Sequence, residues 1–208
     1  MLLPLSLPPP DPVVELFVAT RGMSQGIAQT DGIQVRPRLV VHLGDAQLGA
    51  QWRNITSPAA KGVAMFFVRY GHRVGKVQFD GAVAYRVRTG VSSPFKGTAW
   101  EVTGTARRSF KGWGLRLELQ YSPQDFGNGQ SLYLEAGPAI DLGPATTVSA
   151  NVGRRERQHG PDYASFNVGF TTVVKQRLSV DARLFDTNRG GLGAPFRSRI
   201  AVSARLTL

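Results

Sequence analysis

The stretch "GLRLELQYSPQDFGNGQSLYLEAGP", residues 114–138, indicates the fold class. Leu115, Leu117 and Leu119 alternate with polar residues, and after a segment rich in Gly and Asn the alternation returns with Leu132 and Leu134. A period of two residues is typical of β-strands that have one apolar face. The question is whether this leucine face packs against a protein core or against a lipid bilayer.

The same period runs through the whole chain, whereas helical periodicity is not evident over any useful length. Twelve strands are predicted, at residues 13–20, 33–43, 46–55, 63–71, 76–87, 98–108, 114–122, 131–142, 147–155, 164–173, 178–186 and 198–208. One face of these strands is apolar, and the opposite face carries many of the charges. The sequence of 208 residues therefore predicts one domain, residues 13–208, after a Pro-rich leader or signal remnant at residues 1–12.

Two features favour lipid around the strands over a soluble barrel with a leucine core. Short turns such as "GDA" and "HRVG" alternate with longer connections rich in Gly, Pro, Asn and Ser, such as "ITSPAAKG" and "SPQDFGNGQ". This asymmetry is typical of transmembrane barrels, which have short periplasmic turns and longer extracellular loops. A ring of twelve strands is also difficult to fill with apolar side chains, because the lumen widens with strand number.

Aromatic residues on the apolar face lie near strand ends, as in the girdles of membrane barrels. They are Trp52, Tyr70, Tyr85, Trp100 and Tyr121. The sequence thus predicts an all-β, transmembrane, antiparallel up-and-down β-barrel of about twelve strands. Its expected location is the bacterial outer membrane of a Gram-negative cell, with both termini in the periplasm.

The inward face is predicted to carry ten arginines that are candidates for contact with anions. They are Arg36, Arg38, Arg53, Arg69, Arg86, Arg107, Arg116, Arg183, Arg199 and Arg205. In an open lumen they would favour anions, which predicts a small porin-like channel for anionic solutes. Alternatively, they pair with acidic residues and brace a closed lumen, for example Glu101 with Arg116 or Arg86, and Asp181 with Arg199. The barrel would then be a structural or accessory member of an envelope complex, and the sequence leaves both hypotheses open.

Catalytic signals are weak. His159, close in sequence to Asp162 and Ser165, is the one conceivable group for a lipid-modifying outer-membrane enzyme, but a solvated loop is the simpler interpretation. The nucleophile-elbow, zinc-protease and phosphate-loop motifs are absent from the sequence. With no cysteine, the chain also lacks disulfides and thiolate metal sites. We predict no enzyme activity, no catalytic residue, no cofactor and no metal.

The net charge of +11, from 25 Lys and Arg against 14 Asp and Glu, suggests anionic partners. Basic residues on or near the long-loop side are expected to meet lipopolysaccharide phosphates at the lipid surface. They are Lys61, Lys96, Arg154, Arg155, Arg157, Arg189 and Arg197. No nucleic-acid recognition motif is present, so nucleic acid is not an expected partner. The final stretch "RIAVSARLTL" looks like the terminal strand signal read by barrel-assembly machinery, although it ends in Leu208 rather than the usual aromatic residue.

The segment "ATRGMSQGIAQTDG", residues 19–32, contains an Arg-Gly-apolar-Ser-Gln motif followed by a turn. The motif residues are Arg21, Gly22, Ser24 and Gln25. This pattern resembles the start of a proteobacterial family of uncharacterised exported proteins labelled Gcw_chp, and the resemblance implies an outer-membrane barrel with no assigned activity. Because Gly22 permits a tight bend, we expect the motif to fold over the lumen mouth, toward Asp31 or Glu101. A mobile loop that points outward is the alternative.

Overall fold

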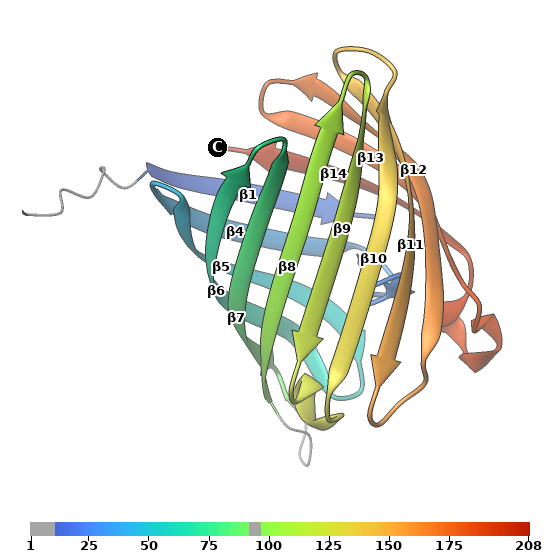
Figure 1. Ribbon diagram of the computed structural model, residues 1–208. Coiled ribbons are helices and arrows are strands. Elements are labelled where there is room, and N and C mark those ends of the chain that lie inside the picture. Colours follow the sequence, from blue (N-terminus) through green and yellow to red (C-terminus); the bar gives the residue numbers. More distant parts are fainter. Residues whose placement is uncertain (1–10, 92–96) are drawn as a thin grey trace, which may run out of the picture.

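The computed structural model describes residues 11–91 and 97–208, and twelve of its strands form a closed antiparallel barrel (Figure 1). The barrel strands are β1 (Asp11–Ala19), β4 (Gln34–Leu43), β5 (Ala46–Ser57), β6 (Ala60–Val74), β7 (Val77–Thr89), β8 (Thr98–Phe110), β9 (Trp113–Ser122), β10 (Ser131–Asp141), β11 (Thr146–Arg157), β12 (Tyr163–Lys175), β13 (Leu178–Thr187) and β14 (Arg199–Thr207). A small hairpin, β2 (Met23–Ser24) and β3 (Ile27–Ala28), forms a separate sheet. The described helices are the 3₁₀ segments η1 (Asp125–Gly127), η2 (Gly190–Leu192) and η3 (Ala194–Phe196).

The ring closes at β1, which pairs with β4 on one side and β14 on the other. In this closure Leu16 lies opposite Leu206 on β14 and opposite Pro37 on β4. The amide of Leu208 donates to the carbonyl of Val14 at 2.8 Å. Because a closed ring has no free edge, the backbone groups of the strands find their partners within the barrel.

The leucine face identified in the sequence lies on the outside of the barrel. Leu115, Leu117 and Leu119 on β9 and Leu132 and Leu134 on β10 are between 39% and 47% exposed. Similar exposed apolar side chains occur on every strand of the ring, whereas soluble monomers rarely expose extended apolar surfaces. The outer surface therefore has the character expected of a face that contacts lipid.

The lumen is filled in part by a small apolar cluster. Phe67 on β6 packs with Val40 on β4 and Ala84 on β7, with Met65 beside them. Gly49 on β5 makes room for this ring, since a Cβ atom at that position would lie 2.1 Å from the Phe67 Cζ atom. The cluster narrows the lumen from one side and leaves polar space beside it.

The twelve predicted strands are all present, and their ends differ from the predicted ends by at most three residues. The alternation of connection lengths is seen except between β5 and β6, and short turns such as those at Gly75 and Gly112 use positive φ angles of 58° and 80°. No helix in the described ranges is long and apolar enough to cross a membrane. Residues 11 and 12 already belong to β1, so the barrel begins before the predicted boundary, and residues 1–10 of the predicted leader lie outside the described part.

One predicted loop is wrong. The sequence predicts a long connection at "ITSPAAKG", but β5 continues to Ser57 and β6 begins at Ala60. The strand is extended because the amide of Thr56 donates to the carbonyl of Gln29 at 2.7 Å, and the register shifts between Asn54 and Ser57. A contact with a distant segment thus converts a predicted loop into strand.

Candidate functional site

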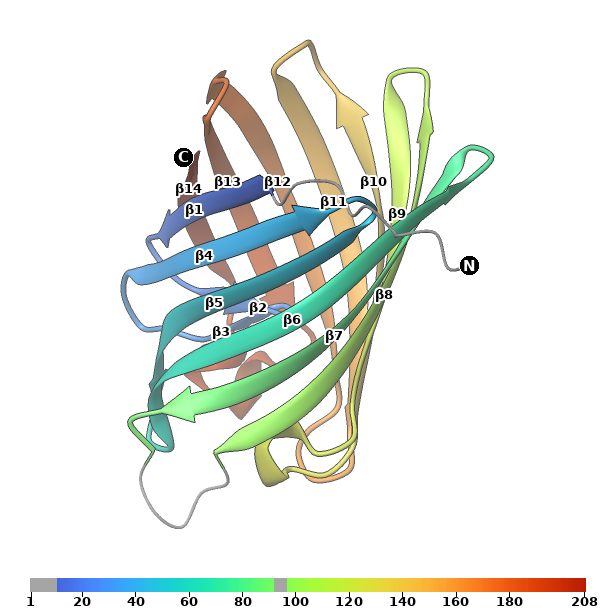
Figure 2. The same cartoon turned by 90° about the vertical axis from the view of Figure 1, so that its left-hand side faces the viewer.

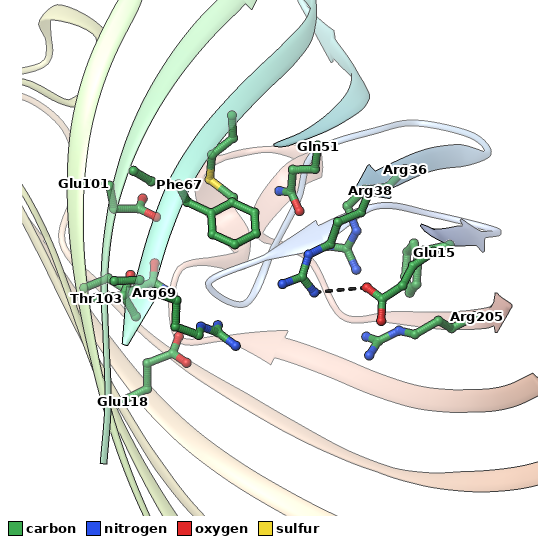
Figure 3. A pocket seen from close by; sticks show the side chains of 15 residues that line it. Glu15, Arg36, Arg38, Gln51, Phe67, Arg69, Glu101, Thr103, Glu118 and Arg205 are labelled. Atoms are coloured by element: carbon green, nitrogen blue, oxygen red, sulfur yellow. Dashed lines mark hydrogen bonds and ion pairs between the residues drawn. The ribbon is translucent and has the colours of Figure 1, made fainter. Parts of the chain in front are cut away.

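The barrel lumen contains a cavity of about 230 Å³ that four arginines line, and we call it the main cavity. In Figure 3 Arg36, Arg38 and Arg205 lie together on one side, and Arg69 extends from the side of Thr103 and Glu118. Arg36 and Arg38 come from β4, Arg69 from β6 and Arg205 from β14. These strands belong to one continuous arc of the ring, β14-β1-β4-β5-β6, and we call these four side chains the arginine wall. Glu101, Glu118 and Gln120 line the same cavity from β8 and β9, across the lumen.

A second cavity of about 430 Å³ continues along the arginine wall. It shares Phe17, Arg36 and Arg205 with the first cavity, and it also reaches Arg21 and Met23. The two cavities therefore form neighbouring parts of one polar space inside the barrel.

Five of the ten predicted lumen arginines form ion pairs. The pairs are Arg38–Glu15 at 3.0 Å, Arg86–Glu101 at 2.7 Å, Arg107–Asp80 at 3.4 Å, Arg116–Glu135 at 2.8 Å and Arg183–Asp181 at 3.2 Å. Arg116 also contacts Glu118. Of the pairings expected from the sequence, Glu101 with Arg86 is present, whereas Asp181 pairs with Arg183 instead of Arg199.

The other five predicted lumen arginines have no salt bridge within residues 11–91 and 97–208. The Arg36 guanidinium lies 4.1 Å from the centre of the Phe17 ring. Arg53, Arg69 and Arg205 form neither ion pairs nor hydrogen bonds within the same ranges, and Arg69 and Arg205 line the main cavity. Arg199 donates to the carbonyl of Ala194 at the rim of the long-loop end. The lumen thus holds paired and unpaired arginines, and the arginine wall contains three of the unpaired ones.

Residues 20–33, which we call the crossing hairpin, fold into the lumen and span it (Figure 2). At its tip Gln25 and Gly26 have φ angles of 52° and 80°. The Gln25 amide donates to Gln120 on β9 at 2.6 Å, and the Tyr163 hydroxyl on β12 donates to the Gln25 carbonyl at 2.9 Å. Because β9 lies six positions from β1 in the ring of twelve, the hairpin reaches the opposite wall.

The base of the crossing hairpin contains the remaining residues of the RGMSQ motif. Gly22 is in close contact with the buried Gln34 side chain, and its amide donates to the Thr30 hydroxyl at 2.7 Å. Arg21 donates to the carbonyl of Asp31 at 3.0 Å, rather than to a carboxylate. Ser24 lines a small cavity of about 110 Å³ near the tip. The structure therefore places this segment inward, and Gln25 makes the contacts with the opposite wall.

A second segment, residues 123–130, also folds inward, and we call it the Asp125 turn. Asp125 is 5% exposed, and its carboxylate lies 2.7 Å from Arg155, 3.8 Å from Arg86 and 4.0 Å from Arg157. Phe126 is 7% exposed and has a φ angle of 50°, a conformation that costs a residue of this kind about 1–3 kcal/mol. The contacts of both side chains must offset that cost.

The sequence did not predict that the Asp125 turn folds inward or that Arg157 lies beside it. The sequence predicts that Arg157 meets lipopolysaccharide phosphates at the lipid surface, but Arg157 approaches Asp125 inside the barrel. The alternation of β11 could have found it, because Gly153, Arg155 and Arg157 share one face. Nothing in the sequence around Asp125 marks that residue as buried.

The predicted girdle residues lie on the outer face. Trp52, Tyr70, Trp100 and Tyr121 are 36–55% exposed, and Tyr85 is covered in part by Trp100, with ring centres 4.9 Å apart. Their function as a girdle stays a prediction. Of the basic residues expected near the lipid surface, Lys61, Arg154, Arg189 and Arg197 are exposed, Arg155 is buried, and Lys96 lies outside the described residues.

The structure does not bring His159 together with its sequence neighbours. Ser165 is buried and lies 3.2 Å from the Tyr133 hydroxyl, while Asp162 accepts the Arg157 amide. The His159 side chain is exposed and has no hydrogen bond to either residue in the described structure. The described residues also contain no group of three or more His, Cys, Asp or Glu side chains arranged to hold a metal ion.

Comparisons with known proteins give a fold and no family. No family model matches the chain, and no curated protein matches it in sequence. Among solved structures, the KdgM porin has a TM-score of 0.65 at 8% identity, with 93% of this chain and 98% of that chain covered. The NanC porin has a TM-score of 0.59 at 11% identity, covering 93% and 97%. An outer-membrane channel from Pseudomonas putida F1 has a TM-score of 0.57 at 11% identity, covering 99% and 96%. The chain thus has the barrel fold of these outer-membrane porins and channels.

Proposed function

We propose that this protein is an outer-membrane pore that favours small anionic solutes. The observation that carries the proposal is the arginine wall, in which Arg36, Arg69 and Arg205 face polar space without a carboxylate partner among the described residues. Guanidinium groups in a pore attract anions, and their planar donors suit carboxylates and phosphates.

The similar barrels support this proposal. KdgM has also been solved in complex with oligogalacturonate, a chain of carboxylated sugars. In the proposed orientation the short turns and both ends of the barrel domain lie on the periplasmic side. The exposed cations Lys61, Arg189 and Arg197 would then meet lipopolysaccharide phosphates, and the barrel-assembly machinery would insert the chain.

Planar-bilayer recordings in a KCl gradient test the proposal. We expect stable conductance and a reversal potential that shows preference for chloride. A unit charge about 5 Å from a permeating ion in water contributes about 0.8 kcal/mol, or about four-fold in local anion concentration. Replacing Arg36, Arg69 and Arg205 together by Gln should therefore reduce the chloride preference about four-fold or more.

The matched control replaces three exposed arginines near the short-turn end, Arg73, Arg108 and Arg177, by Gln. This triple variant has the same net charge as the first, so an equal loss of selectivity in both would show that the arginine wall has no special function. A wild-type barrel with no conductance above leak, or with cation preference, would refute the pore itself.

A structural barrel with a closed lumen is the second candidate, because two segments cross or enter the lumen at the long-loop end. In that case the protein would anchor or support a larger envelope complex and would not catalyse a reaction. Recovery of a stable stoichiometric partner from membranes, together with a silent bilayer recording, would favour this function. The relationship to the Gcw_chp proteins stays a proposal that rests on the RGMSQ motif.

A further inference from the structure

The Asp125 turn places one carboxylate among a second group of arginines. None of these arginines belongs to the arginine wall. Arg53, Arg86, Arg155 and Arg157, which we call the constriction cluster, line a small cavity of about 110 Å³ together with Asp125. Gln25 and Ser24 of the crossing hairpin form another side of this cavity. The cluster is therefore located where the two inward-folded segments meet.

The constriction cluster has more positive charge than its carboxylates offset. Asp125 and Glu101 are the acidic groups in ion pairs with its members. Arg53 makes no hydrogen bond or ion pair to any described residue, and the buried Nε atom of Arg157 has no hydrogen-bond partner in the same part of the chain. Arg88 lines the same cavity, so five guanidinium groups surround two carboxylates, and donor capacity remains unused at Arg53 and at the Arg157 Nε atom.

The carboxylate that occupies the cluster belongs to a turn rather than to the barrel wall. Phe126 follows it with a φ angle of 50° and lies beneath the guanidinium groups of Arg86 and Arg88, which are 4.8 Å and 4.3 Å from its ring centre. The Asp125 amide donates to the Gly129 carbonyl at 2.9 Å, which closes the turn on itself. Contacts of these two inward side chains hold the turn in the lumen, where Phe126 also packs against Val63 on β6 and Ala99 on β8. The backbone of the turn accepts a hydrogen bond at the Asn128 carbonyl from the His159 amide at 3.1 Å, which belongs to the neighbouring loop and not to a barrel strand.

We propose that the constriction cluster is an anion-binding site and that Asp125 is its tethered internal ligand. A solute carboxylate or phosphate would compete with Asp125 for Arg155, Arg157 and Arg86, and would displace the turn from the lumen. A tethered ligand acts at an effective concentration in the millimolar range, so it weakens the apparent binding of a free competitor without preventing it. A function of the displaced turn in opening the lumen rests on the proposed pore. Anion binding at the constriction cluster does not depend on conduction.

The test measures citrate binding to the folded barrel in detergent by calorimetry. Asp125→Asn retains the size of the side chain and removes its charge, so citrate should bind about ten-fold more tightly than to the wild type. Asp80→Asn is the matched control, since Asp80 also pairs with a lumen arginine, Arg107, and lines neither the cavity of the constriction cluster nor the two cavities along the arginine wall. Citrate affinity should be unchanged in this control. Adding Arg155→Gln to Asp125→Asn should abolish the gain.

A second variant covers the case in which Asp125→Asn does not fold. Phe126→Ala leaves Asp125 and every arginine in place but loosens the turn, and it should also strengthen citrate binding. Equal citrate affinity in the wild type and in whichever of these variants folds would overturn the proposal, as would an equal gain in Asp80→Asn. If citrate binding changes as expected but no barrel conducts in bilayers, the pore function fails while the anion site stands.

Discussion

Leu117 tests the assignment of the outer face at one defined depth. The ten residues of β9 at about 3.4 Å each span about 34 Å, which a tilt of about 40° reduces to about 26 Å along the membrane normal. Leu117 is the fifth residue of β9 and is 47% exposed, so its side chain should lie near the middle of the apolar band. Leu117→Arg should therefore lower the free energy of unfolding by about 2–4 kcal/mol.

Thr103→Arg is the matched inward control. Thr103 lines the main cavity from the neighbouring strand β8, where an added guanidinium stays hydrated, so the expected change is within about 0.5 kcal/mol. Gln120 also points inward, but it is a poor control because its side chain accepts the hydrogen bond from Gln25. Leu117→Ala separates lost apolar contact from added charge, and it should cost about 1–2 kcal/mol.

The assay is a urea titration of folding into lipid vesicles, followed by tryptophan fluorescence. If Leu117→Arg and Thr103→Arg change the free energy of unfolding equally, the two faces are wrongly assigned. If Leu117→Arg costs no more than Leu117→Ala, the outer surface at this depth is not in a hydrocarbon environment.

Two other perturbations address the lumen. Gly26→Val would place a Cβ atom 2.1 Å from the Ser165 Cβ atom, so the hairpin tip must leave the wall and single-channel conductance should rise. Gly32→Val, where no atom lies within 4 Å, is the control, and equal conductance in both variants would show that the hairpin is no barrier. Tyr133→Phe removes the hydroxyl that donates to Glu135 at 2.8 Å, and it should lower the free energy of unfolding by about 1–2 kcal/mol. An unchanged urea midpoint for Tyr133→Phe would show that this buried hydrogen bond adds nothing.

The barrel could be predicted from the sequence because a period of two residues restricts both the strand register and the choice of the outer face. In β9 a shift of one residue would turn Leu115, Leu117 and Leu119 inward and place Arg116 and Glu118 in lipid, so register and face are fixed together. The failure at "ITSPAAKG" has a different origin. Pro58 interrupts the pattern, and the hydrogen bond from Thr56 to Gln29 that extends the strand comes from a distant segment.

The inward direction of the arginines could be predicted, but their partners could not. Asp181 lies opposite Ser203 on β14, whereas Arg199 lies opposite Phe185, four residues further along the sheet. At about 3.4 Å per residue that distance is about 14 Å, too far for a salt bridge. Arg183 is two residues away on the same face and is the partner found. Pairing depends on register and side-chain reach, and alternation alone fixes neither.

The Asp125 turn shows a different limit. A segment with Gly127, Asn128 and Gly129 is typical of an exposed loop, and a positive φ angle at Phe126 runs against the local preference. The groups that make this conformation favourable are arginines on β7 and β11 and the apolar residues Val63 on β6 and Ala99 on β8, which pack against Phe126. Only the closed ring brings these four strands around the turn. The sequence shows an excess of inward arginines over inward carboxylates. This excess indicates that an anionic group enters the lumen, but it does not identify Asp125 as that group.

The two functions suggested by the sequence use different parts of the same lumen. Arg86, Arg107, Arg116 and Arg183 are paired and come from β7, β8, β9 and β13. The unpaired arginines of the arginine wall come from the arc of strands around β1. Among the described residues of that arc, Glu15 is the only carboxylate that lines the main cavity, and Glu101 and Glu118 line it from β8 and β9. Three of the five ion-paired arginines thus lie on β7, β8 and β9, across from β1, whereas Arg38 and Arg183 form their pairs on or beside the arginine wall. Because the crossing hairpin runs from the arginine side to Gln120 on β9, its displacement would widen the space beside the arginine wall while leaving the ion pairs of β7, β8 and β9 intact.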